Sequence, residues 1–74
     1  MDEQSLGEQL CRHRKRLGVS QEYLADILRL DQTYISKTET GKRQLTVDEF
    51  ARWCIALNLD DKETLSILRS VGSS

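Results

Sequence analysis

The sequence predicts an all-α protein, built as a compact domain of five short helices. The 74 residues contain no proline and four glycines, so few positions interrupt a helix. Aromatic residues make up 5% of the chain, which argues against a strand-rich sandwich or barrel. Apolar residues recur at intervals of three and four, between residues suited to capping helices. A chain of this length is expected to form one domain, residues 1–74.

Two short helices are predicted in the first part of the chain. The apolar face of the first helix comprises Leu6, Leu10 and Leu17. Gly18 is expected to end this helix, because glycine adopts the left-handed backbone conformation without strain. Ser20 can cap a second helix, because its hydroxyl can accept a hydrogen bond from the first turn. The inward face of that second helix is predicted to comprise Leu24, Ala25 and Leu28.

A third helix is predicted over residues 32–40, after a tight connection that ends at the capping residue Asp31. Gly41 is expected to end this helix. Tyr34 and Ile35 are its only strongly apolar residues, so most of its surface must lie outside the core. That surface carries polar side chains that share one helical face, namely Gln32, Thr33, Ser36 and Lys37.

The last part of the chain predicts two further helices. Thr46 and Glu49 form the pattern of a capping box, which opens the fourth helix. The core stripe of this helix is predicted to comprise Val47, Phe50, Ala51, Cys54 and Leu57, with Trp53 at its edge. Asp60 is predicted to cap the fifth helix. The apolar residues of the fifth helix are Leu65, Ile67, Leu68 and Val71.

The net charge of −1 conceals an uneven distribution along the chain. Residues 1–10 contain three acidic and no basic residues, and residues 44–74 contain five acidic and three basic residues. Residues 11–43 contain eight basic and four acidic residues. The basic residues of this middle segment include the run from Arg12 to Arg16 and the later group Lys37, Lys42 and Arg43. Such a segment is a candidate footprint for a polyanion.

The sequence contains no complete motif for an enzyme, a metal or a cofactor. Cys11 and Cys54 match no short metal-binding or redox spacing, and both are expected to be reduced. Gly41 and Lys42 do not form a phosphate-binding loop, because the earlier glycine of that motif is Ser36 and no strand precedes it. We therefore expect no catalysis, no metal, no cofactor and no small-molecule substrate.

The sequence also indicates where the protein acts. Its apolar runs are all short, and no basic-then-apolar leader starts the chain. We therefore expect a cytoplasmic protein that does not associate with a membrane.

Two short helices joined by a tight turn, the second with a polar exposed face, form the layout of a DNA-binding helix-turn-helix. Three segments carry a closer likeness: Leu17-Gly18-Val19-Ser20-Gln21-Glu22-Tyr23-Leu24-Ala25, Tyr34-Ile35-Ser36-Lys37 and Glu39-Thr40-Gly41-Lys42-Arg43. Over about residues 6–59 the chain resembles the Cro and phage-repressor type of helix-turn-helix protein, the Xre-like family. The resemblance implies a lambda-repressor-like fold with the motif over about residues 20–40. It also implies a transcription regulator, expected to be a repressor, that binds double-stranded DNA as a homodimer.

The resemblance also implies roles for individual residues, with residues 32–40 as the recognition helix in the major groove. The positions of base-reading residues are held here by Gln32, Thr33, Ser36 and Lys37. The expected contacts to DNA phosphates are Gln21, Tyr34, Lys42 and Arg43. Arg14 and Glu39 match a pair that, in relatives, bridges the first helix to the end of the recognition helix. We expect this ion pair to be partly buried.

Side-chain chemistry supports the same roles independently. Glutamine can pair bidentately with adenine, lysine can donate to guanine acceptors, and the threonine methyl group can pack on a thymine methyl group. Lys42 and Arg43 follow a glycine in a loop, where cations can bind phosphates and position the protein without reading sequence.

Four residues depart from the family's pattern, namely His13, Arg29, Thr38 and Leu45, and two interpretations stay open. Arg29 stands in the turn where relatives usually have glycine, so it must take a left-handed conformation or alter the turn. Thr38 replaces a usual apolar residue of the third helix. The apolar edge of Trp53, Ile67 and Val71 is either core or a dimer interface. The alternative function is a protein-binding helical module, such as an antitoxin or adaptor, which the acidic ends of the chain would suit.

Overall fold

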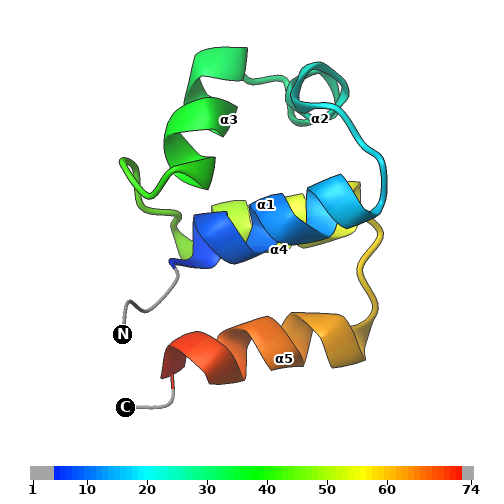
Figure 1. The fold of residues 1–74 in the computed structure, drawn as a ribbon, viewed down its shortest axis with the longest axis vertical. Coiled ribbons are helices and arrows are strands. Elements are labelled where there is room, and N and C mark those ends of the chain that lie inside the picture. The colour runs from blue at the N-terminus through cyan, green and yellow to red at the C-terminus, as the bar shows by residue number, and fades with distance from the viewer. Residues whose placement is uncertain (1–4, 73–74) are drawn as a thin grey trace.

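Five α-helices and no strand are formed by residues 5–72, the part of the chain that the computed structural model describes. The helices are α1 (Leu6–Arg16), α2 (Gln21–Leu28), α3 (Gln32–Glu39), α4 (Val47–Ala56) and α5 (Asp61–Gly72). Figure 1 shows α2 and α3 at one end of the long axis, α5 at the other, and α1 and α4 between them. The expected all-α class is confirmed. None of these helices is long and apolar enough to cross a membrane.

Short polar side chains cap the helix N-termini, because they accept backbone N–H groups that have no partner within the helix. The capping residues of α1 to α4 are Ser5, Ser20, Asp31 and Thr46. Asp60 accepts the backbone N–H of Glu63 at 2.7 Å in the first turn of α5. The capping box between Ser5 and Glu8, which begins α1, was not among the sequence predictions.

The core lies where α1, α2, α3 and α4 meet and extends to one side chain of α5. Its buried apolar residues are Leu10, Leu24, Ala25, Ile35, Phe50, Trp53, Cys54, Leu57 and Ile67. Both cysteines are free, as the sequence analysis expected. Burial raises the pKa of the Cys54 thiol, so this side chain acts as a small apolar residue.

The inward face of α4 differs from the predicted stripe. Trp53, expected at the edge, is only 2% exposed, whereas Val47 is 87% exposed and Ala51 is also exposed. The buried residues Phe50, Trp53, Cys54 and Leu57 are related by steps of three and four. Because the large indole of Trp53 is buried, the inward face of α4 is centred nearer to Trp53 than the predicted stripe was. Val47 and Ala51 therefore lie outside that face. The prediction that Val47 and Ala51 belong to the core was therefore wrong, and of the two interpretations left open for Trp53 the structure supports the core.

Leu17, which was predicted on the apolar face of the first helix, is exposed, and so are two leucines of α5. Leu17 is 46% exposed, because α1 ends at Arg16 and the chain turns away through Gly18, whose φ is +73°. Leu65 and Leu68 of α5 are also exposed, whereas Ile67 is buried. A helix packed on one side can bury only one narrow stripe, and α5 packs chiefly against α1. The side chain of Val71 lies outside the described residues.

The connection between α2 and α3 turns at Arg29, in the left-handed conformation that was one of the two alternatives left open by the sequence. Its φ and ψ are 56° and 44°, a conformation that costs a residue with a Cβ about 1–2 kcal/mol. The backbone N–H of Leu30 donates to the carbonyl oxygen of Ala25 at 2.9 Å, which satisfies the end of α2. The chain therefore reverses within three residues, and α3 packs directly against α2.

Gly7 is the point of closest approach between α1 and α3. A Cβ atom at Gly7 would overlap the carbonyl oxygen of Thr38 and lie 2.9 Å from its Cγ2 atom. Thr38 is itself fully buried, so a bulkier side chain there would have no room beside α1. The short threonine that departs from the family's pattern therefore matches a glycine on the facing helix.

Candidate nucleic-acid interface

One face of α3 is anchored in the protein and the other is open to solvent. Ile35, Thr38 and Glu39 are buried and fix the helix against α1 and α2. The face predicted to read bases is exposed at every position, namely Gln32, Thr33, Ser36 and Lys37. An eight-residue helix with this division presents short polar side chains on a rigid support.

A buried ion pair joins α1 to the C-terminal end of α3. Arg14 Nε donates to Glu39 Oε2 at 2.6 Å, and Arg14 Nη2 donates to Glu39 Oε1 at 2.9 Å. The two side chains are only 9% and 2% exposed. Arg14 Nη1 also donates to the carbonyl oxygen of Val19 at 2.6 Å, between α1 and α2. One guanidinium group therefore holds together α1, the connection that follows α1, and α3.

The charged form of the Glu39 carboxylate is stabilised in this setting. Burial by itself raises the pKa of Glu39, but hydrogen bonds from Arg14 and Gln21 and the positive charge of Arg14 bring it below its usual value. The hydrogen bond to Glu39 outweighs burial at Arg14 and raises its pKa above the usual value. Burial also raises the pKa of the adjacent Cys11 thiol. Both members of the pair are therefore ionised at neutral pH.

Gln21 links this ion pair to the exposed face of α3. Its Nε2 donates to Glu39 Oε1 at 2.8 Å, and its Oε1 accepts from Gln32 Nε2 at 3.4 Å. Gln21 was predicted to contact DNA phosphate, and it lies half-buried at the first position of α2. The first residue of the predicted reading face is therefore hydrogen-bonded, through one side chain, to a buried carboxylate.

The two cations of the loop after α3, Lys42 and Arg43, differ in their contacts with the rest of the protein. Lys42 is exposed, and the described residues provide no ion pair for its side chain. The Arg43 guanidinium lies over the ring of Tyr34, 5.2 Å from its centroid. It also donates to Glu49, with Nη1–Oε1 at 3.3 Å and Nη2–Oε2 at 2.5 Å. The sequence analysis identified Glu49 only as a capping residue and missed this contact, for which its spacing gives no signal.

In the comparison with protein families, residues 5–66 match a model described as a helix-turn-helix domain. This range contains α1 to α4 and the first half of α5. The chain belongs to the helix-turn-helix domain family. No curated protein and no solved structure matches it. Membership in the family indicates a DNA-binding regulator and agrees with the resemblance read from the sequence.

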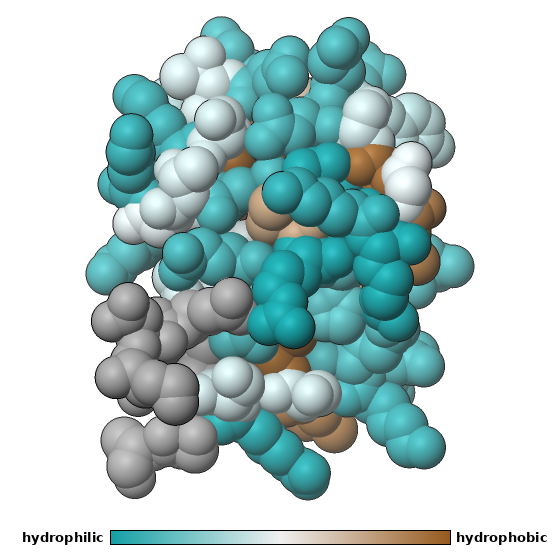
Figure 2. Space-filling view, viewed as in Figure 1, coloured by the Kyte–Doolittle hydropathy of each residue, from teal (hydrophilic) through white to brown (hydrophobic). Residues whose placement is uncertain are grey.

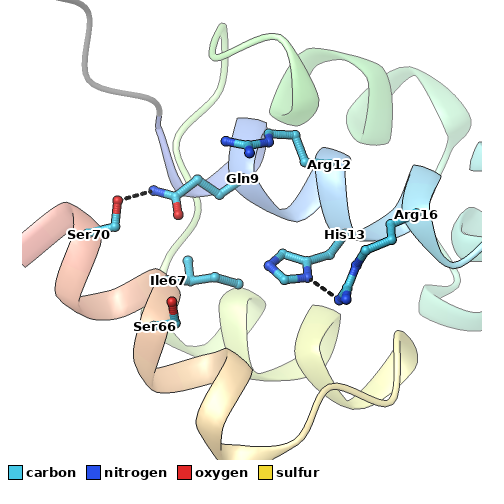
Figure 3. Close-up of a pocket in the computed structure, with 7 residues that line it drawn as sticks. All are labelled: Gln9, Arg12, His13, Arg16, Ser66, Ile67 and Ser70. Atoms are coloured by element: carbon cyan, nitrogen blue, oxygen red, sulfur yellow. Dashed lines mark hydrogen bonds between the residues drawn. The ribbon is translucent and has the colours of Figure 1, made fainter.

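One cavity of the helix-turn-helix protein lies away from α3. It has a volume of about 560 Å³ and opens between α1 and α5, beside residues such as His13, Arg16 and Ile67 (Figure 3). Glu63 of α5 pairs with Arg16 and lies 3.6 Å from His13 Nδ1, and Arg16 lowers the pKa of Glu63. These polar contacts attach α5 to α1. They are separate from the candidate interface.

The surface of the helix-turn-helix protein is largely hydrophilic in the view of Figure 2, with small apolar areas between polar side chains. The exposed cations of α1 are Arg12, Lys15 and Arg16. The basic run of α1 therefore does not act as one group. Arg14 is buried in the ion pair with Glu39, while its neighbours face solvent.

Proposed function

We propose that this chain is a sequence-specific double-stranded DNA-binding regulator that acts in the cytoplasm, with residues 32–40 as its recognition helix. It acts as a single domain and requires no catalysis and no cofactor. Repression is the proposed action, because a domain bound over a promoter blocks polymerase by occupancy alone. The observation that carries the proposal is the exposed polar face of α3, held in place by the buried pair of Arg14 and Glu39.

The size and chemistry of α3 suit the major groove. B-DNA admits an α-helix there, and each base pair presents its own pattern of donors and acceptors. Gln32 and Lys37 supply the two longest polar side chains of the exposed face, and Thr33 and Ser36 supply short ones between them. We propose that these four side chains read base edges. Because α3 is fixed by buried contacts at three positions, little order is lost when it docks.

We propose that a second group of residues grips the DNA backbone without reading sequence. Lys42 supplies the exposed cation of the loop, and Tyr34 supplies an exposed hydroxyl on α3. Gln21 lies at the start of α2, where backbone N–H groups also point outward. Arg43 belongs to the same group, although its charge is already paired with Glu49.

Truncation of a base-reading residue and truncation of a phosphate-binding residue are expected to change DNA binding in different ways. Gln32→Ala or Lys37→Ala should cost roughly 1–3 kcal/mol on the preferred site and relax selectivity at one base position. Lys42→Ala should weaken binding to all duplexes about equally and make the salt dependence shallower by about one unit. Selection from random duplexes identifies the preferred site. Titrations of that site and a scrambled duplex at several salt concentrations then separate the two effects.

The same titrations test the competing interpretation of the chain as a protein-binding module. A surface that binds phosphates releases condensed counterions, so its affinity must fall steeply as salt rises. Affinity for duplex DNA that does not depend on salt would contradict the proposed function. An unchanged ratio of specific to scrambled binding in both Gln32→Ala and Lys37→Ala would remove α3 as the reading element.

We also propose that two copies pair through α5. Trp53 and Ile67 are buried within one copy and cannot form the dimer interface that the sequence suggested. Among the described side chains of α5, Leu65 and Leu68 are apolar, exposed and three residues apart, and they can fill this role. Sedimentation at high micromolar concentration should give a dimer, and Leu68→Glu should give a monomer. On DNA, half-sites should then lie about 34 Å apart. A monomeric wild-type protein, with and without DNA, would contradict this proposal.

A further inference from the structure

The loop after α3 carries two cations, Lys42 and Arg43, and Arg43 already forms an ion pair with a carboxylate of the same chain. Arg43 and Glu49 form an ion pair with two hydrogen bonds, in which Nη1 donates to Oε1 and Nη2 donates to Oε2. We propose that Glu49 competes with DNA phosphates for Arg43 and thereby weakens the sequence-independent part of DNA binding. This inference rests on the DNA binding proposed above.

Glu49 is held in position by the start of α4, independently of Arg43. Its Oε1 accepts the backbone N–H of Thr46 at 3.0 Å, and its own N–H donates to Thr46 Oγ1 at 3.1 Å. This capping box fixes the carboxylate at a defined point beside the loop. The hydrogen bond from Arg43 lowers the pKa of Glu49, so the carboxylate stays charged at neutral pH.

Arg43 is confined from a second side as well. Its guanidinium group lies over the ring of Tyr34, which belongs to α3. The side chain thus bridges α3 and α4 across the loop, in the orientation that a forked contact to an anion requires. A carboxylate and a phosphate accept the same fork of donors. Glu49 therefore occupies the donors of Arg43 that a DNA phosphate would use.

The ion pair between Arg43 and Glu49 is expected to lower the number of cations that can neutralise DNA phosphates. A cation that neutralises a phosphate releases a condensed counterion, and each such contact adds about 0.9 to the salt slope. While Glu49 neutralises it, Arg43 contributes little to that count. The pair is only partly exposed, with side-chain exposures of 32% and 23%, so salt does not fully screen it. Lys42, one residue earlier, has no such partner among the described residues.

Glu49→Gln is the substitution that tests this competition. Glutamine at the same position keeps the capping-box hydrogen bonds and removes only the charge. The variant should bind both specific and scrambled duplexes about two- to fivefold more tightly at low salt, as expected when one partly exposed ion pair is removed. Its salt dependence should be steeper by about one unit. Thermal melts followed by circular dichroism establish that the variant is folded.

Asp48→Asn is the matched control for the change in net charge. Asp48 precedes Glu49 in the same turn of α4, but it pairs with Arg52 at 3.2 Å and not with the loop. This variant should keep the salt slope of the wild-type protein. Glu49→Gln and Arg43→Gln should also couple. Arg43→Gln should cost little affinity when Glu49 is present and several times more in the Glu49→Gln background.

Each outcome of these measurements decides the question. Equal gains in affinity and slope from Asp48→Asn and Glu49→Gln would show a general charge effect and overturn the competition. An unchanged salt slope in Glu49→Gln, or no coupling to Arg43→Gln, would also overturn it. Either result leaves the proposed DNA binding intact. If the wild-type protein binds no duplex with salt-dependent affinity, the proposed function fails and the competition fails with it.

Discussion

Replacing Glu39 with alanine is expected to lower the free energy of unfolding by about 3–5 kcal/mol, because the Arg14 guanidinium would be left buried without its counter-charge. The same change removes the acceptor of the Gln21 side chain. Both effects loosen the end of α3 that is attached to α1. Denaturant unfolding of the variant and the wild-type protein gives this difference directly.

The exposed pair of Asp48 and Arg52 supplies the control for this measurement. Their side chains are 75% and 68% exposed and lie one turn apart on α4. Asp48→Ala should therefore change stability by less than about 0.5 kcal/mol. If Glu39→Ala is no more destabilising than Asp48→Ala, the buried pair does not hold the recognition helix in place.

The lowered pKa of Glu39 also predicts how stability depends on pH. A carboxyl group whose pKa is lower in the folded state stabilises the fold above its unfolded pKa of about 4.3. This contribution is lost as the pH falls through the folded pKa. Stability should therefore decline below about pH 4, and the decline should be smaller in Glu39→Gln than in the wild-type protein. Unfolding curves between neutral and strongly acidic pH provide the comparison.

Gly7→Ala should be among the most damaging single substitutions in the chain. In a helix interior this change usually adds about 0.5–1 kcal/mol of stability. Here the added methyl group would overlap the Thr38 carbonyl oxygen, so α1 and α3 would have to separate. We expect a loss of at least about 3 kcal/mol, the upper end of the usual cost of overpacking.

Thr38→Ala provides a test of the cause of that loss. Truncating the Thr38 side chain removes Cγ2 but leaves the carbonyl oxygen, which is the nearest atom to the added methyl group. The double variant should therefore be no more stable than Gly7→Ala alone. Recovery of stability in the double variant, measured by thermal unfolding, would mean that the side chain and not the backbone sets the distance between the helices.

Local signals predicted most of the architecture. Ser20, Asp31 and Thr46 cap the helices they were expected to cap, because capping depends on residues within one turn. The left-handed turn at Arg29 was one of two alternatives that the resemblance left open, because relatives usually have glycine at this position. The exposed face of α3 followed from its few apolar residues. These features depend on short stretches of sequence, which can be interpreted without the fold.

The features that were missed depend on the packing of one helix against another. Trp53 turned out to be buried, and Val47 exposed, because the rotation of α4 is set by its neighbours as well as by its own periodicity. The fit of Gly7 against Thr38 joins positions 31 residues apart and leaves no local pattern. The pairing of Arg43 with Glu49 is equally hidden, since six residues of loop and helix separate them.

Because α2 and α3 are short, the two helices cannot be transplanted into another protein without the contacts that support them. Each helix has eight residues, whereas helices shorter than about 12–15 residues are only marginally stable in water. Their helical structure is stabilised by contacts with α1 and α4, which include the ion pair of Arg14 and the core residues. A peptide containing the two helices alone would lack those supports. A portable unit therefore has to include α1 and α4 as well as α2 and α3, and a graft of the reading face alone would have to rebuild the buried side of α3 on its new host.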